Sequence, residues 1–318
     1  MALRSLRSST VAVLVTGMSC ALVGAQKDRT VPRALDGHPD LQGLWVNNTA
    51  TPLERPRRFA EKEYLTEAEA AAYEKDYESR FRDLLGDLEA QTTGEIDDIW
   101  NESGPVVPSR RTSLIVDPPD GKVPPLTLEG RRRADARAEA RKQHPADGPE
   151  DLTLWSRCLL SIFGTPMRPI SMNPNLQIVQ TRDYLMILGE AIHEARIIPL
   201  DGRPHLPSRI RRWTGDSRGR WEGDSLVIDT TNFTDQPTIS GSDAQLHVVE
   251  RLTRESMDLI RYDFTIDDAT IFTRSWTASL PLRRGSGPIY EYACHEANYS
   301  LVNVLRGARA AEHEQKEP

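Results

Sequence analysis

The chain lacks the short motifs that identify the common classes of enzyme. It contains no nucleophile elbow, phosphate-binding loop, dinucleotide fingerprint, HExxH zinc motif or EF-hand loop. Residues 215–219 place a serine between two glycines, but they lack the strand-then-helix setting of a nucleophile elbow, so we interpret them as a tight loop. No reaction follows from a motif, and no cofactor is expected.

Cysteine is scarce, with three residues in a chain of 318. Only Cys158 and Cys294 lie beyond the N-terminal apolar run, and neither has a second cysteine at metal-ligand spacing, which argues against a cysteine-based metal site. In an oxidising compartment such a pair predicts a disulfide. Two free buried thiols are the alternative.

Long apolar runs are absent beyond residue 25. Arg4 and Arg7 precede an uncharged run over 10–25 that ends in small residues, a layout that predicts a signal peptide cleaved after Ala25. The run holds about sixteen residues, fewer than the roughly twenty that span a bilayer as a helix. We therefore expect a periplasmic or secreted protein; an uncleaved anchor and a lipoprotein modified at Cys20 are the alternatives.

Positive charge is in deficit, because 40 Lys and Arg oppose 47 Asp and Glu for a net charge of −7. Removal of a leader with two arginines and no acidic residue lowers the net charge to −9. Such a surface repels phosphate backbones and anionic lipids, which argues against nucleic acid as a partner. The expected partner is a small molecule, with no membrane span in the mature chain and the oligomeric state left open.

The mature chain is long enough for one large domain. We expect a linker over 26–40, the domain over 41–306 and a disordered tail over 307–318. Two helical insertions are expected within the domain, at about 66–88 and 127–160.

The first insertion begins like a capping box and then carries aromatic and leucine residues at helical spacing. The second combines a helix over about 127–143 with a shorter one over 150–160, for which Pro149 is a suitable start and Cys158 an end.

The rest of the domain has the pattern of antiparallel β-structure. A strand is expected over 113–117, and closely spaced strands bounded by turn residues follow. They cover 176–181, 184–189, 192–200, 219–222, 225–231, 246–254, 259–266, 271–280 and 289–296. Such a meander buries its edges best by closing into a barrel. Gly43-Leu44-Trp45 resembles the start of lipocalin-like barrels, where the indole closes the floor. The expected fold is mainly β: an antiparallel up-and-down, lipocalin-like barrel with N-terminal helical insertions.

Alternation with a period of two assigns the faces of three strands. On 246–254 it turns Glu250 inward with Leu252, and on 271–280 it turns Arg274 inward. A lone buried charge is unfavourable, so each should have a partner or a ligand. The expected apolar ligand-binding wall consists of Tyr262, Phe264, Phe272 and Trp276.

Two histidines are candidates for acid–base chemistry. His193 lies on the expected strand over 192–200, opposite in face to Glu194 and Arg196; a structural histidine is the alternative. His295 follows Cys294 on the strand over 289–296, and Tyr292 on that strand is expected to contact the ligand. The disulfide would hold these groups rigidly, as it would in a purely structural role.

A metal site is not expected. The candidate ligands would be His193, His205, His247 and His295, but no two of them have the close spacing of zinc ligands.

Five blocks of the chain carry a resemblance. They are 39–45, 193–207, 221–233, 246–251 and 290–298, which include Pro-Asp-Leu-Gln-Gly-Leu-Trp, Trp-Glu-Gly-Asp-Ser and Tyr-Glu-Tyr-Ala-Cys-His-Glu. In these blocks the chain resembles a family of exported bacterial proteins. The resemblance implies a bacterial, periplasmic protein, and it implies no activity.

Two functions fit these observations. The first is a cofactor-free acid–base enzyme (an isomerase, lyase or hydrolase), in which His193 or His295 moves the proton, Glu250 orients the histidine or acts as base, and Arg274 stabilises negative charge. The second is a carrier in which the same groups orient a partly apolar ligand. A structural envelope protein, whose inner polar groups satisfy one another, is a third possibility.

Overall fold

The computed structural model describes residues 31–91, 102–160, 164–236, 241–296 and 298–314. The expected signal peptide over 1–25 lies outside the described residues, as do the first residues of the expected linker.

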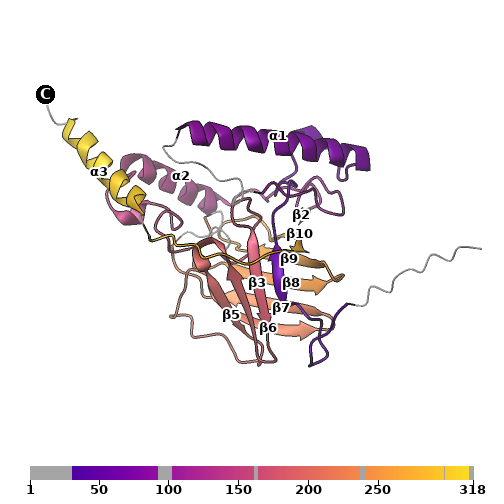
Figure 1. The fold of residues 1–318 in the computed structure, drawn as a ribbon. Helices are drawn as coiled ribbons and strands as arrows, with labels where there is room; N and C mark the ends of the chain where they lie inside the picture. The colour runs from indigo at the N-terminus through magenta and orange to yellow at the C-terminus, as the bar shows by residue number, and fades with distance from the viewer. Residues whose placement is uncertain (1–30, 92–101, 161–163, 237–240, 297, 315–318) are drawn as a thin grey trace, which may run out of the picture.

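A single antiparallel sheet, nearly closed into a barrel, forms the centre of the molecule (Figure 1). Its strands follow the order β5-β4-β3-β1-β10-β9-β8-β7-β6, and β2 pairs with β10 off this path. They are β1 (Gly43–Val46), β2 (Ile115–Asp117), β3 (Asn175–Gln180), β4 (Tyr184–Gly189), β5 (Ala195–Pro199), β6 (Asp216–Glu222), β7 (Ser225–Thr231), β8 (His247–Arg254), β9 (Leu259–Asp267) and β10 (Trp276–Arg284). The expected antiparallel barrel is confirmed.

The seam of the barrel lies between β5 and β6. Apart from β2, the strands follow one another around the ring in chain order, and β1 joins β10 to β3. A ring with an odd number of strands cannot alternate direction everywhere, and the registers make β5 and β6 the parallel neighbours. No backbone pairing joins these two strands, both of which lie in the described part of the chain. The loop over 200–215 therefore has to return along the outside of the barrel.

Side chains close the seam where backbone bonds do not. Gly219 of β6 lies so close to β5 that a Cβ there would be 2.4 Å from Leu200 Cδ2 and 3.2 Å from Ile198 Cγ2. The glycine lets these two apolar side chains pack directly against the β6 backbone, and a larger residue would require Leu200 to shift.

Trp45 of β1 belongs to the buried core of the barrel. Its side chain is fully buried, and its indole N–H donates to the Leu41 carbonyl at 2.9 Å. The guanidinium groups of Arg254 and Arg284 lie 5.1 and 5.6 Å from its ring centroid. The Gln180 side chain accepts from the Leu41 N–H at 2.8 Å and so joins the residues that precede β1 to β3.

The helices lie outside the sheet, above it in the view of Figure 1. Helix α1 covers Glu67–Gln91 and α2 covers Leu128–Gln143, which confirms helices in the two expected insertions. Thr127 caps α2 by accepting from the Gly130 N–H at 2.9 Å. Across the described ranges, no helix combines the length and apolar character needed to cross a membrane.

Three local predictions are wrong. Residues 150–160 form no α-helix, because the 3-10 turn Pro149–Asp151 gives way to a series of tight turns. Residues 289–296 form no strand, and the segment runs over the barrel end instead. Helix α3 (Tyr299–Glu314) occupies most of the expected disordered tail, and Arg309 ties it to the carbonyls of Ala146 and Asp147.

Candidate functional site

A buried ion pair crosses the interior of the barrel. Arg196 of β5 donates from Nη1 to Glu250 Oε1 of β8 at 2.9 Å, and its Nη2 donates to Glu250 Oε2. The Glu250 side chain is fully buried and that of Arg196 is 9% exposed. Burial opposes the charge of the guanidinium, but the adjacent carboxylate outweighs this effect and raises the pKa of Arg196. The prediction that Glu250 faces inward and has a charged partner is confirmed, and the partner is Arg196.

Two hydroxyls complete the arginine's contacts. Arg196 Nε and Nη2 donate to Ser217 Oγ at 3.0 and 2.8 Å, and Nη2 also reaches Thr230 Oγ1 at 2.9 Å. Ser217 lies on β6 and Thr230 on β7, so one guanidinium connects β5 to three strands on the other side of the seam. These side-chain hydrogen bonds join the strands at the seam, where no backbone hydrogen bonds pair β5 with β6.

Tyr262 connects the ion pair to the backbone of Met167, which lines the pocket described below. Its hydroxyl donates to Glu250 Oε1 at 2.6 Å and accepts from the Met167 N–H at 3.0 Å. Burial, reinforced by the negative charge of Glu250, raises the pKa of Tyr262 well above its usual value. The tyrosine therefore stays a neutral donor, and the Met167 backbone is fixed over the ion pair.

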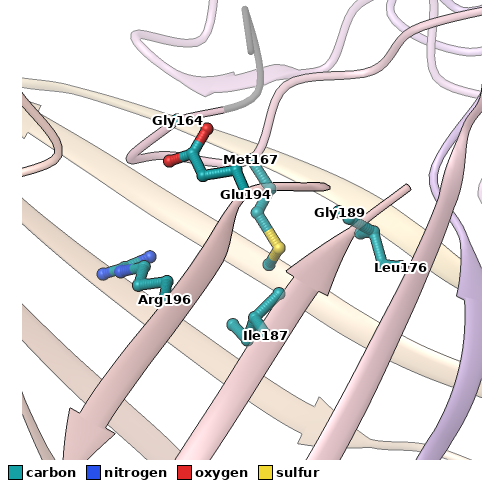
Figure 2. A pocket seen from close by; sticks show the side chains of 7 residues that line it. All are labelled: Gly164, Met167, Leu176, Ile187, Gly189, Glu194 and Arg196. Atoms are coloured by element: carbon teal, nitrogen blue, oxygen red, sulfur yellow. The ribbon is translucent and has the colours of Figure 1, made fainter. Parts of the chain in front are cut away.

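A shallow pocket lies between Met167 and strands β3 to β5 (Figure 2). Met167, Leu176 and Ile187 give it an apolar wall, and Glu194 and Arg196 contribute the charged side chains. Its volume is about 20 Å³, room for one water-sized group. A ligand in this structure could place only a terminal group in the pocket.

The prediction that Arg274 faces the interior is wrong. Its side chain is 51% exposed and donates to Asp117 Oδ2 at 2.6 Å on the surface. Strand β10 begins only at Trp276, so residues 271–275 form a turn to which the period-two alternation does not apply. Arg274 and Glu250 are not brought together.

The aromatic residues expected to bind a ligand do face inward, but they fill the interior. Each side chain is at most 1% exposed, and neighbouring rings pack with centroids 5.9 to 6.1 Å apart. This set comprises Tyr262, Phe264, Phe272 and Trp276. Their contact with a ligand stays a prediction.

The candidate histidines lie at the barrel end, away from Glu250. His193 is exposed in the turn Ala191–His193 rather than on a strand, and its Nδ1 is 3.1 Å from the Tyr292 carbonyl. His295 is exposed in a turn. The contact of His193 is with the Tyr292 carbonyl rather than with the Arg196–Glu250 pair, so a role of these histidines in catalysis stays a prediction.

The predicted disulfide is present between Cys158 and Cys294, whose Cα atoms are 5.7 Å apart. The disulfide ties residues 290–296 to the turns around Cys158. There Trp155 and Tyr292 form an edge-to-face pair with centroids 5.9 Å apart. Glu190, which is buried, accepts from the Tyr290 N–H at 2.9 Å and fixes the same segment to the end of β4.

A second polar cluster lies on the outer face of β6 and β7. His205 Nδ1 is 3.1 Å from Asp216 Oδ2, and its Nε2 is 2.9 Å from Asp229 Oδ1. His247 Nε2 is 2.8 Å from Asp229 Oδ2. Among the described residues no group of three or more candidate ligands is arranged to hold a metal ion.

The sequence contained signals for the residues that were missed. Arg196 shares the phase of buried Ile198, and Ser217 and Thr230 share the phase of apolar inner residues on β6 and β7. These strands are too short and too polar for alternation alone to separate inner from outer positions.

No protein-family model matches the chain, and no curated protein matches its sequence.

Proposed function

We propose that this chain is a binding protein for a small, partly apolar organic molecule held at the barrel end beside Arg196. The observation that carries the proposal is the pocket itself, in which an apolar wall meets the guanidinium of Arg196, whose position is fixed by three neighbours, Ser217, Thr230 and Glu250. We favour binding over acid–base catalysis because the structure brings neither His193 nor His295 to Glu250.

Arg196 suggests the chemistry of the ligand's polar end. A guanidinium has five N–H donors, and the Nη1 group donates one of its two hydrogens to Glu250 Oε1. We propose that its second hydrogen donates to an acceptor oxygen of the ligand. A ligand with a carbonyl, hydroxyl or carboxylate oxygen next to an alkyl group would match this donor and the wall of Met167, Leu176 and Ile187.

Gly189 offers a direct test, because it lines the pocket. A Cβ at this position would meet only ordinary contacts, the nearest at 3.8 Å, so alanine fits without disturbing the fold. Gly189→Ala and Gly189→Val should fill the pocket in two steps. Gly307→Val is the control, since an added Cβ there has nothing within 4 Å.

The experiment is native mass spectrometry of protein purified from its own periplasm, followed by thermal unfolding with aliphatic carboxylates, amides and alcohols of increasing length. A ligand at a hundred times its Kd stabilises by about 2.7 kcal/mol, which corresponds to a rise in Tm of about 5 °C or more. We expect the shift in wild type and Gly307→Val, and its loss in Gly189→Val. A shift that survives in Gly189→Val would disprove this site. Conversion of the bound molecule that depends on Glu250 would instead support the enzyme.

We also propose that the protein is exported and that its leader is removed after Ala25. The disulfide supports an oxidising compartment. Intact-mass measurement of the protein from its native source should give a chain beginning at Gln26; a chain that still begins at Met1 would contradict export by this route.

A further inference from the structure

The outer cluster and the buried network share the same two strands. Asp216 and Ser217 are consecutive on β6, and Asp229 and Thr230 are consecutive on β7. Because successive residues of a strand face opposite sides, the carboxylates point outward while the hydroxyls point inward to Arg196. Ser217 and Thr230 are also directly paired across the two strands. Movement of this part of the wall would therefore reach both sides.

The cluster holds the loop over 200–215 against the wall. Besides the contacts of His205, the Leu206 N–H donates to Asp216 Oδ2 at 2.8 Å, and Asn232 Nδ2 donates to the Leu206 carbonyl at 2.8 Å. Arg218 Nε donates to the Pro204 carbonyl at 3.0 Å. The loop is the connection that the parallel seam requires, so these contacts decide how it lies across β6 and β7.

His205 lies between two carboxylates, one next to each of its ring nitrogens. Carboxylate oxygens only accept hydrogen bonds, so Nδ1 and Nε2 both have to donate, one to Asp216 and the other to Asp229. A neutral imidazole has a single N–H. The two contacts can exist together only when the ring carries two protons and a positive charge.

His247 extends the cluster to β8. Its hydrogen bond to Asp229, reinforced by the negative charges of Asp229 and of Asp267 on β9, raises the pKa of the imidazole. Arg218 contributes the remaining cation and donates from Nη1 to Asp216 Oδ1 at 2.8 Å. The three carboxylates exceed this guanidinium by two charges, which two imidazolium groups balance.

We propose that His205 and His247 form a proton-dependent latch that fastens the loop over 200–215 to the barrel wall in mildly acidic solution and releases it as the pH rises and the cluster loses protons. Deprotonation removes one of the two bonds of His205 and leaves Asp216, Asp229 and Asp267 in excess over Arg218. The loop then retains fewer contacts, and the wall behind Ser217 and Thr230 loses its outer support.

The direction of the pH effect follows from His247. A pKa raised in the folded state means that the stabilisation is complete below the unfolded value, about 6.5, and is lost as the pH rises through the folded value. The carboxylates limit the window on the acid side, since hydrogen bonds from His247 and His205 lower the pKa of Asp229. The latch is thus closed in mildly acidic solution and opens as the pH rises through the folded pKa of His247.

The protonation state can be measured directly in the wild-type protein. In ¹⁵N-labelled full-length protein in EDTA, long-range proton–nitrogen spectra report whether each imidazole nitrogen carries a proton. We expect His205 to be doubly protonated at pH 6. A neutral His205 at that pH would overturn the proposal, and this measurement does not depend on whether any variant folds.

Hydrogen exchange then tests the release. We expect amides over 200–215 and at Ser217 and Thr230 to exchange faster at pH 8.5 than at pH 6 after correction for intrinsic rates, by about tenfold for each unit by which folding raises the pKa of His247. His205→Gln and His247→Gln should lower this pH dependence. His144→Gln should retain it, because His144 pairs with Asp147 at the exposed end of α2. Equal corrected rates at both pH values would refute the latch.

Discussion

Arg196 and Glu250 form a bidentate pair inside the barrel although β6 and β7 lie between their strands across the unpaired seam. The pair is possible because β5 and β6 are parallel and unpaired, so that the arginine extends across the interior instead of along a ladder of backbone bonds. The same side chain lines the pocket at the barrel end. The closure of the fold and the proposed binding site therefore depend on one residue.

Removing either member of this pair should be strongly destabilising. Arg196→Met or Glu250→Gln leaves an uncompensated charge in the interior, which costs about 3–5 kcal/mol. The double variant should be less destabilised than the sum of the single variants by about 0.5–3 kcal/mol, because no lone charge remains. Urea denaturation of the four proteins measures this coupling, and additive single effects would show that the two groups do not interact.

Arg274→Ala should behave very differently. Both Arg274 and its partner Asp117 are about half exposed, so their ion pair is screened by water and contributes at most about 1 kcal/mol. We expect the urea midpoint to stay close to that of wild type, and ligand binding at the barrel end to be unchanged. A loss of several kcal/mol, or of binding, would place this arginine in the interior after all.

Asp216→Asn should make the free energy of unfolding depend less steeply on pH in acidic solution. Burial raises the pKa of Asp216, but the Leu206 N–H, His205 and Arg218 outweigh it and the net pKa is lowered. Its contribution is therefore present above the unfolded value, about 3.9, and is lost as the pH falls through the folded value. Between pH 5 and pH 2.5 the variant's unfolding free energy should fall less steeply than that of wild type.

Asp120→Asn, at an exposed turn, is the matched control for this series. Its free energy of unfolding should fall with pH as that of wild type does. If Asp216→Asn and Asp120→Asn give the same curve, the carboxylate of Asp216 does not contribute in the way described.

Cys158→Ser with Cys294→Ser should lower stability and loosen the segment over 290–296. The disulfide joins residues 136 apart in the chain, and the chain-entropy model gives about 4–5 kcal/mol for a loop of that size. The Tyr290 and Tyr292 amides should exchange faster, whereas Val248 and Phe264 in the barrel should change only with global stability. Uniform changes throughout the chain would show that the disulfide does not hold this segment locally.

The fold was largely readable from the sequence where strands are long and cleanly alternating. On β9 the inner positions of Ile260, Tyr262, Phe264 and Ile266 are as expected, because one face of that strand is apolar and the other is polar. The prediction failed for Arg274 and for 289–296. In both cases local composition favoured a strand, while the chain had to turn or to run over the barrel end.

The candidate site was found only in part. Alternation placed Glu250 inside, and burial of a charge required a partner. Its identity could not be predicted, because Arg196 lies 54 residues away in the chain on a strand that does not pair with β8. His205 and His247 are 42 positions apart and meet through Asp229 only because β6, β7 and β8 are neighbours.

The sequence by itself determined most of the strands, the helices of the two insertions, the inward direction of Glu250 and the pairing of two cysteines, since each depends on local periodicity or on the number of candidates. The tertiary structure alone decided which strands are parallel at the seam, which charge meets Glu250 and how much space the aromatic rings leave. These properties depend on the closure of the sheet, which brings distant residues within hydrogen-bond distance and fills the interior to the density of a packed core.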